Sequence, residues 1–195
     1  MIENLCDHQK YQKAIDLFEE MEKSHLKLDC SAFISVSKAV IGLNDLLLAS
    51  KLYTKVLESG IQLTINLLNS LIYMFSKCGD FEKAKDIWEQ MKVKDISTWN
   101  IILDTLVHYG KIQEVLNLFD DIVNQSIQVN SITLVCVCKA ITSLGDLERA
   151  NTFYLKHIQN KDLQNLQLSS SLVIMFSKCG DLERSLSIFQ HSTTK

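Results

Sequence analysis

The chain has 195 residues, of which 47% are hydrophobic and 22% are charged, and its formal net charge is −3. This composition agrees with a soluble packed protein. No apolar run approaches the roughly 18 to 20 residues that a transmembrane helix needs, and the opening residues MIENLCDHQK lack the basic and apolar regions of a secretory signal. We therefore expect neither membrane insertion nor secretion.

An internal repeat organises the chain. The heptapeptide MFSKCGD occurs at Met74–Asp80 and again at Met175–Asp181, an offset of 101 residues. Other like residues stand at the same offset: Ala39 and Ala140, Tyr53 and Tyr154, and Phe18 and Phe119.

Turn residues divide this long period into shorter units. Four glycines stand at intervals of 31, 35 and 35 residues, namely Gly79, Gly110, Gly145 and Gly180. Asn44 stands 35 residues before Gly79, and asparagine is the non-glycine residue that best tolerates a positive φ. Periods of this size predict a solenoid, in which each unit buries its apolar face only against its neighbours.

Apolar residues recur at spacings of three, one and three along the chain, which predicts amphipathic helices. In chain order these stripes are Ala14, Leu17, Phe18 and Met21; Ala49, Leu52, Tyr53 and Val56; Ala84, Ile87, Trp88 and Met91; and Val115, Leu118, Phe119 and Ile122. A second apolar segment precedes the turns, as at 67–75 and 99–107, so each unit is predicted to be helix, turn, helix. No window alternates strictly as a half-buried strand does, so the predicted fold class is all-α.

The motifs of common enzymes and cofactor sites do not occur in the sequence. It has no GxxxxGK[ST], GxGxxG, GxSxG or HExxH, and none of its five histidines begins an HxE. His157 takes the place of Met, Val or Ile in the helical stripe and is expected to pack between helices. Cys136 and Cys138 lie two apart on a predicted helix, which is poor spacing for a metal pair. We expect buried reduced thiols, no metal, no cofactor and no enzymatic activity.

The segment INLLNSLIYMFSKCGDFEKAKDIWEQMKVKD at 65–95, followed by ISTWN at 96–100, resembles the pentatricopeptide repeat family. The alternating unit lengths resemble its subclass in which standard, long and short motifs recur in triplets. This resemblance implies a right-handed superhelical α-solenoid of helix-turn-helix repeats that covers the whole chain as one array. The implied motifs are 1–29 (partial standard), 30–64 (long), 65–95 (short), 96–130 (standard), 131–165 (long) and 166–195 (short, near complete).

The resemblance also implies binding of single-stranded RNA, with about one base read per motif by two side chains. In the family these are the fifth and the last residue of a motif, which here gives Asn69 with Asp95 for uracil and Asn100 with Asn130 for a pyrimidine. Ser170 matches a fifth position that the family often uses for purines. The implied phosphate contacts are Lys77, Lys178 and His108.

Two alternatives stay open at this point. A tetratricopeptide-like scaffold for protein partners has the same helix-pair architecture, although that family repeats every 34 residues whereas this chain alternates 31 and 35. The chain also resembles the RNA-recognition fragment of a cytidine-deaminase editing factor whose catalytic domain is missing. The family resemblance implies mitochondrial RNA processing or editing, with plastid and cytoplasm as the other locations, and RNA-processing or editing proteins as partners.

Overall fold

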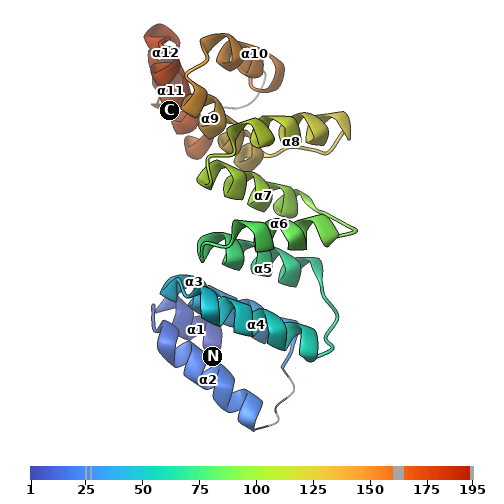
Figure 1. Ribbon diagram of the computed structural model, residues 1–195. Helices are drawn as coiled ribbons and strands as arrows, with labels where there is room; N and C mark the ends of the chain where they lie inside the picture. Colours follow the sequence, from blue (N-terminus) through green and yellow to red (C-terminus); the bar gives the residue numbers. More distant parts are fainter. Residues whose placement is uncertain (25, 27, 160–164, 194–195) are drawn as a thin grey trace. The chain divides into compact units, whose positions relative to one another are not determined.

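The computed structural model describes residues 1–24, 26, 28–159 and 165–193, and its regular elements there are all α-helices (Figure 1). Their bounds are α1 Ile2–Asp7, α2 Tyr11–Lys23, α3 Cys30–Leu43, α4 Leu46–Glu58, α5 Ile65–Lys77, α6 Phe81–Gln90, α7 Ile96–His108, α8 Ile112–Asn124, α9 Ser131–Leu144, α10 Leu147–His157, α11 Leu166–Cys179 and α12 Leu182–Thr193. The all-α fold is therefore confirmed for the described residues. The handedness of the superhelix stays a prediction.

The helices form two compact units, residues 1–102 and 103–195, which we call unit 1 and unit 2. In unit 1, α3 packs between α1 and α5, so the first helices of successive pairs form one layer (Figure 1). The second helices form the other layer, because α2 packs on α1 and α3, α4 on α3 and α5, and α6 on α5. The second helices α2 and α4 thus each contact the first helix of the following pair as well as that of their own.

Unit 2 repeats this arrangement. Helix α9 packs on α11, while α8 contacts α9, α10 contacts both α9 and α11, and α12 contacts α11. Aromatic side chains pack within and between the layers: Phe119 of α8 meets Phe153 of α10 edge to face at 5.8 Å between ring centroids, and Tyr154 of α10 meets Phe176 of the first helix α11 at 5.5 Å. The same side-chain chemistry therefore closes the core in each unit.

The turns lie where the sequence places them. Asn44 ends α3 in the left-handed region with φ of 53°, and Gly79 and Gly180 follow α5 and α11 with φ of 97° and 94°. Side chains with a Cβ are strained at such angles, which explains glycine at these two equivalent positions of the repeat. The prediction of these turns is confirmed.

Polar side chains cap most of the helices. Asp80 accepts a hydrogen bond from the backbone N–H of Lys83 at the start of α6, and Asp181 does the same for Arg184 at the start of α12, both at 2.9 Å. Such caps satisfy N–H groups that have no partner inside the helix. The first helices of five pairs begin at Cys30, Ile65, Ile96, Ser131 and Leu166. The assignment of standard, long and short motifs stays a prediction, and residues 160–164 and 194–195 lie outside the described part.

Buried thiols pack as small apolar groups. Burial raises the pKa of Cys136 to about 11 and that of Cys138 to about 12, so both stay protonated at neutral pH. Within the described residues, no cluster of three or more His, Cys, Asp or Glu side chains is arranged to hold a metal ion. None of the described helices is long and apolar enough to cross a membrane.

Candidate functional site

The structure brings Asn69 and Asp95 together in unit 1. Asn69 lies in α5 and is 7% exposed, and Asp95 immediately precedes α7. The Asn69 Nδ2 group donates a hydrogen bond to Asp95 Oδ1 across 3.3 Å, although the two residues are 26 apart in sequence. The two side chains predicted to share one base are therefore direct neighbours.

A second residue, Thr98, fixes the Asp95 carboxylate. The backbone N–H and the hydroxyl of Thr98 both donate to Asp95 Oδ1 at 2.8 Å, and the Asp95 N–H donates to Thr98 Oγ1 at 3.3 Å. Partial burial opposes ionisation of Asp95, but the hydrogen bonds from Thr98 and Asn69 outweigh it and hold the pKa below its ordinary value. Asp95 is thus a charged acceptor at neutral pH.

This charge orients the Asn69 amide. An ionised carboxylate only accepts hydrogen bonds, so the NH₂ group of Asn69 must face Asp95 and its Oδ1 must face away. That Oδ1 is buried and has no hydrogen-bond partner among the described residues. Buried polar atoms are nearly always paired in folded proteins, so this acceptor is an exception.

The second predicted pair is divided between the two units. Asn100 lies in α7 in unit 1 and is 6% exposed. Asn130 is exposed in unit 2, where it caps α9: its Oδ1 accepts from the N–H and the hydroxyl of Thr133, both at 3.1 Å. Asn130 and Asp95 therefore have the same local geometry at the starts of two first helices. Ser170 is exposed on α11.

The three candidate phosphate contacts stand near the ends of first helices. Lys77 ends α5 and is half-buried, with its ammonium 5.1 Å from the centroid of the Tyr73 ring. Lys178 is exposed in the last turn of α11. His108 is exposed at the end of α7, with its ring 5.2 Å from that of Tyr109. Positive charge is favourable at a helix C-terminus, so this position alone suits lysine or histidine.

Three features of the first-helix surface were missed from sequence. Tyr73 is 40% exposed and stands four residues after Asn69 and four before Lys77, so the three share one face of α5. Two lysines on equivalent faces are held by carboxylates: Lys38 pairs with Glu3 at 2.6 Å, and Lys139 with Asp104 at 3.3 Å. The repeat spacing predicts these two ion pairs, because the partners in each pair are 35 residues apart.

A family model for the pentatricopeptide repeat matches residues 1–26, 67–96 and 97–127. The chain contains pentatricopeptide repeats. Among curated relatives, Pentatricopeptide repeat-containing protein At3g03580 of Arabidopsis thaliana is 30% identical over 193 residues, which cover 97% of this chain and 22% of that protein. The mitochondrial protein At4g31070 of the same plant is 26% identical over 100% of this chain and 31% of its own length. The chain therefore spans less than a third of the length of these relatives.

Solved structures show the same fold. Pentatricopeptide repeat protein PPR10 in complex with an 18-nt psaJ RNA element superposes with a TM-score of 0.67 at 14% identity, covering 97% of this chain and 33% of that one. PPR10 from maize superposes with a TM-score of 0.63 at 14% identity, covering 97% and 32%. The matched pentatricopeptide repeats include Asn69, Asp95 and Asn100, whereas Asn130 and Ser170 lie outside them.

Proposed function

We propose that this chain binds single-stranded RNA and that Asn69 and Asp95 together recognise one uracil. The observation that carries this proposal is the oriented Asn69 amide, whose Nδ2 donates to Asp95 and whose buried Oδ1 lacks a partner among the described residues. Pentatricopeptide repeats and the likeness to RNA-bound PPR10 support it.

The orientation of the amide explains the choice of base. Uracil carries an N–H donor at the centre of its Watson–Crick edge, whereas cytosine carries a bare nitrogen acceptor there. The Asn69 Oδ1 can accept from the first and repels the second. Asp95 enforces this preference because its charge prevents the Asn69 amide from turning over. Guanine also presents a donor at its edge, so a guanine tract belongs in the test.

The other predicted residues complete the proposed interface. Asn100 and Asn130 form a second pair for a pyrimidine, and Ser170 contributes to reading a purine. Lys77, Lys178 and His108 contact phosphates, at helix ends where positive charge is already favoured. Stacking and backbone contacts then supply most of the affinity, while the amide pair supplies selectivity.

We further propose that the chain is a recognition module and that RNA-processing or editing proteins supply any chemistry. Relatives named mitochondrial, such as At4g31070, and chloroplastic, such as At1g11290, support an organellar location, for which we favour the mitochondrion. Imaging a fluorescent fusion of the full-length gene product against mitochondrial and plastid markers tests this location.

The direct test is a titration of short labelled uridine, cytidine, adenosine and guanosine tracts, followed by fluorescence polarisation. We expect the uridine tract to bind best and Asn69→Ala to weaken it about tenfold, the effect of about 1.4 kcal/mol. Asn124→Ala, on the exposed end of α8, is the matched control and should bind as the native chain does. The proposal fails if all four tracts bind alike and Asn69→Ala changes none of them.

A second readout comes from the protein itself. Its two tryptophans, Trp88 and Trp99, both lie in unit 1 and meet edge to face at 5.6 Å. Trp99 directly follows Thr98, which holds Asp95. Binding at Asn69 and Asp95 is therefore expected to change tryptophan emission, whereas RNA bound only in unit 2 is not.

A further inference from the structure

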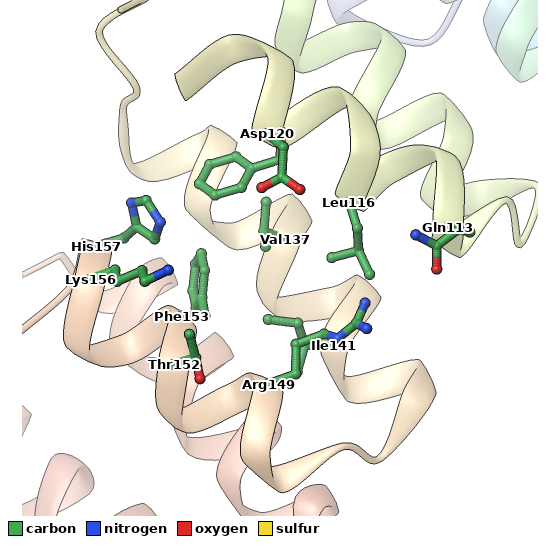
Figure 2. A pocket seen from close by; sticks show the side chains of 11 residues that line it. Gln113, Leu116, Asp120, Val137, Ile141, Arg149, Thr152, Phe153, Lys156 and His157 are labelled. Atoms are coloured by element: carbon green, nitrogen blue, oxygen red, sulfur yellow. The ribbon is translucent and has the colours of Figure 1, made fainter. Parts of the chain in front are cut away.

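Unit 2 contains a pocket that is separate from the proposed reading residues. It lies between the second helices α8 and α10, with the first helix α9 as its floor (Figure 2). Its volume is about 290 Å³. We call it the α8–α10 pocket, and its lining residues are Gln113, Leu116, Phe119, Asp120, Val137, Ile141, Arg149, Thr152, Phe153, Lys156 and His157.

Unit 1 has a counterpart of this pocket at the 101-residue offset, and it is nearly filled. The hollow between α2 and α4 holds only about 50 Å³. Nine of its lining residues stand at the positions of residues of the α8–α10 pocket: Ile15, Phe18, Glu19, Val36, Val40, Leu48, Lys51, Leu52 and Lys55. Equivalent residues therefore line a nearly filled hollow in unit 1 and an open pocket in unit 2.

The two hollows differ in one ion pair at the rim. In unit 1 the Lys55 ammonium pairs with Glu22 and lies 5.9 Å from the centroid of the Phe18 ring, so the side chain covers the hollow. In unit 2 the residue equivalent to Lys55 is Lys156, but the place of Glu22 is taken by Val123. Among the described residues, Lys156 makes no ion pair, so its charge remains available at the rim.

The floor of the α8–α10 pocket is apolar, and its rim carries charged side chains. Leu116, Val137, Ile141 and Phe153 form the lower part, and Figure 2 shows Val137 and Ile141 between the side chains of the other two helices. His157 closes one wall, with its ring 5.0 Å from Phe119 and 5.6 Å from Phe153. This packing agrees with the role predicted for His157. An aromatic or large aliphatic group would bury its surface here.

The rim carries opposite charges on opposite sides. Lys156 and Arg149 stand on α10, where the Arg149 Nε already lies 3.6 Å from Asp146 Oδ2, and Asp120 stands on α8 (Figure 2). Lys156 can pair with one carboxylate of a ligand, and Asp120 can accept a hydrogen bond from an N–H group. A peptide segment offers both groups beside an apolar side chain.

We propose that the α8–α10 pocket receives a large apolar side chain of a partner protein, with a carboxylate of the same segment reaching Lys156. A protein is favoured over a small molecule for two reasons. The pocket is at the lower end of the roughly 300 to 1,000 Å³ of small-molecule sites. Val123, which is 39% exposed one turn beyond Phe119 on α8, continues the apolar surface past the rim, so a longer occupant is needed to cover it. The proposal does not depend on RNA binding, because none of the candidate reading residues lines the pocket.

The test uses a capped tetrapeptide, alanine–phenylalanine–glutamate–alanine, and methyl NMR spectra of the whole chain. Methyl groups of Leu116, Val137 and Ile141 report the α8–α10 pocket, and those of Val36 and Val40 report its closed counterpart. We expect shifts only in the first set, with a dissociation constant of about 1 mM. A glutamine version of the peptide should bind about threefold more weakly, and a version with alanine for phenylalanine should not bind.

Two surface variants separate this site from adventitious binding. Lys156→Gln should abolish the preference for glutamate over glutamine. Val123→Glu should supply the carboxylate that unit 1 has at Glu22 and weaken the glutamate peptide by threefold or more, about 0.7 kcal/mol. Circular dichroism establishes that each variant is folded. Absence of methyl shifts, equal shifts in both hollows, or N-acetylphenylalanine binding as tightly as the tetrapeptide would each overturn the proposal.

Discussion

The two copies of MFSKCGD pack alike although they lie in different units. In unit 1, Phe75 meets Tyr53 edge to face with ring centroids 5.6 Å apart, and in unit 2, Phe176 meets Tyr154 at 5.5 Å. A cation covers each tyrosine: Lys83 lies 4.6 Å from the Tyr53 centroid, and the equivalent arginine lies 5.7 Å from that of Tyr154. The repeated Phe75 and Phe176 thus serve the interior of the repeat.

Other positions on the same first helices differ between the two copies. Asn69 is buried against Asp95, whereas its counterpart Ser170 is exposed. Tyr73 beneath the Lys77 ammonium is replaced by Ile174, which is 54% exposed. The scaffold is therefore the same in the two copies while the candidate recognition surface is not. Selectivity must be sought outside the repeated heptapeptide.

Removing the shared aromatic anchor should have the largest effect. Phe75 is 1% exposed and Phe176 is 0% exposed, so Phe75→Ala and Phe176→Ala should each lower the free energy of unfolding by about 3–5 kcal/mol. Urea unfolding followed by circular dichroism measures both. Tryptophan emission should follow Phe75→Ala more closely, because Trp88 and Trp99 lie in unit 1. A cost below about 1 kcal/mol for either variant would break the equivalence of the two copies.

Changing the turn glycines should cost less. Gly79 and Gly180 have φ of 97° and 94°, and an added Cβ would meet no atom within 4 Å at either site. Only backbone strain remains, so Gly79→Ala and Gly180→Ala should each lower the free energy of unfolding by about 1–2 kcal/mol. Asparagine at the same places should cost less than alanine because it tolerates the left-handed region. Equal costs for alanine and asparagine would show that the turn angle is not the cause.

The pattern of turns and helices was predictable because it depends on local chemistry. Asn44, Gly79 and Gly180 were found from spacing alone, since a left-handed residue needs glycine or asparagine whatever surrounds it. The resemblance to pentatricopeptide repeats also named Asn69 and Asp95. The orientation of the Asn69 amide was not predictable, because it depends on a contact between residues 26 apart and on Thr98.

The α8–α10 pocket was missed for a related reason. Neither Val123 nor Lys156 is unusual on a helix surface, and the pocket is recognised only when Val123 is compared with Glu22 in the closed copy. An alignment of the two halves of the chain at the 101-residue offset shows this replacement of Glu22 by Val123. For Asn130 the sequence allows two explanations. Its side chain caps α9, and this local role alone explains an asparagine at that position.

Replacing the charge of Asp95 sharpens the comparison between Asn69 and Ser170. Asp95→Asn retains a side chain that can cap α7 but can also donate, so the Asn69 amide is free to turn over. We expect uridine and cytidine tracts to bind within about threefold of each other, a loss of selectivity of about 1 kcal/mol relative to the native chain. Ser170→Ala should leave the ratio of uridine to cytidine affinity unchanged.

The pH dependence follows from the same carboxylate. Its pKa in the folded chain is held below the ordinary value of 3.8, so the Asp95 charge stabilises the fold above that value and is lost only as pH falls through the lower folded pKa. Uridine selectivity should therefore be constant between about pH 5 and pH 8. A titration of selectivity with a midpoint in that range would exclude Asp95 as the orienting group.

The smallest expected effect concerns the lysines of the first-helix surface. Val135 is the fifth residue of the implied motif 131–165, and Lys139 lies four residues after it on the same face of α9. The Lys139 ammonium pairs with Asp104 at 3.3 Å. Asp104→Asn should free this cation for phosphate, raise RNA affinity about threefold and steepen the slope of log affinity against log salt by about 0.7. Asp121→Asn makes the same change of net charge on the second helix α8 and is the matched control. If both variants raise affinity equally, net charge alone is responsible. If only Asp104→Asn does, RNA follows the first helices, and the ion pair limits how strongly an acidic chain can bind it.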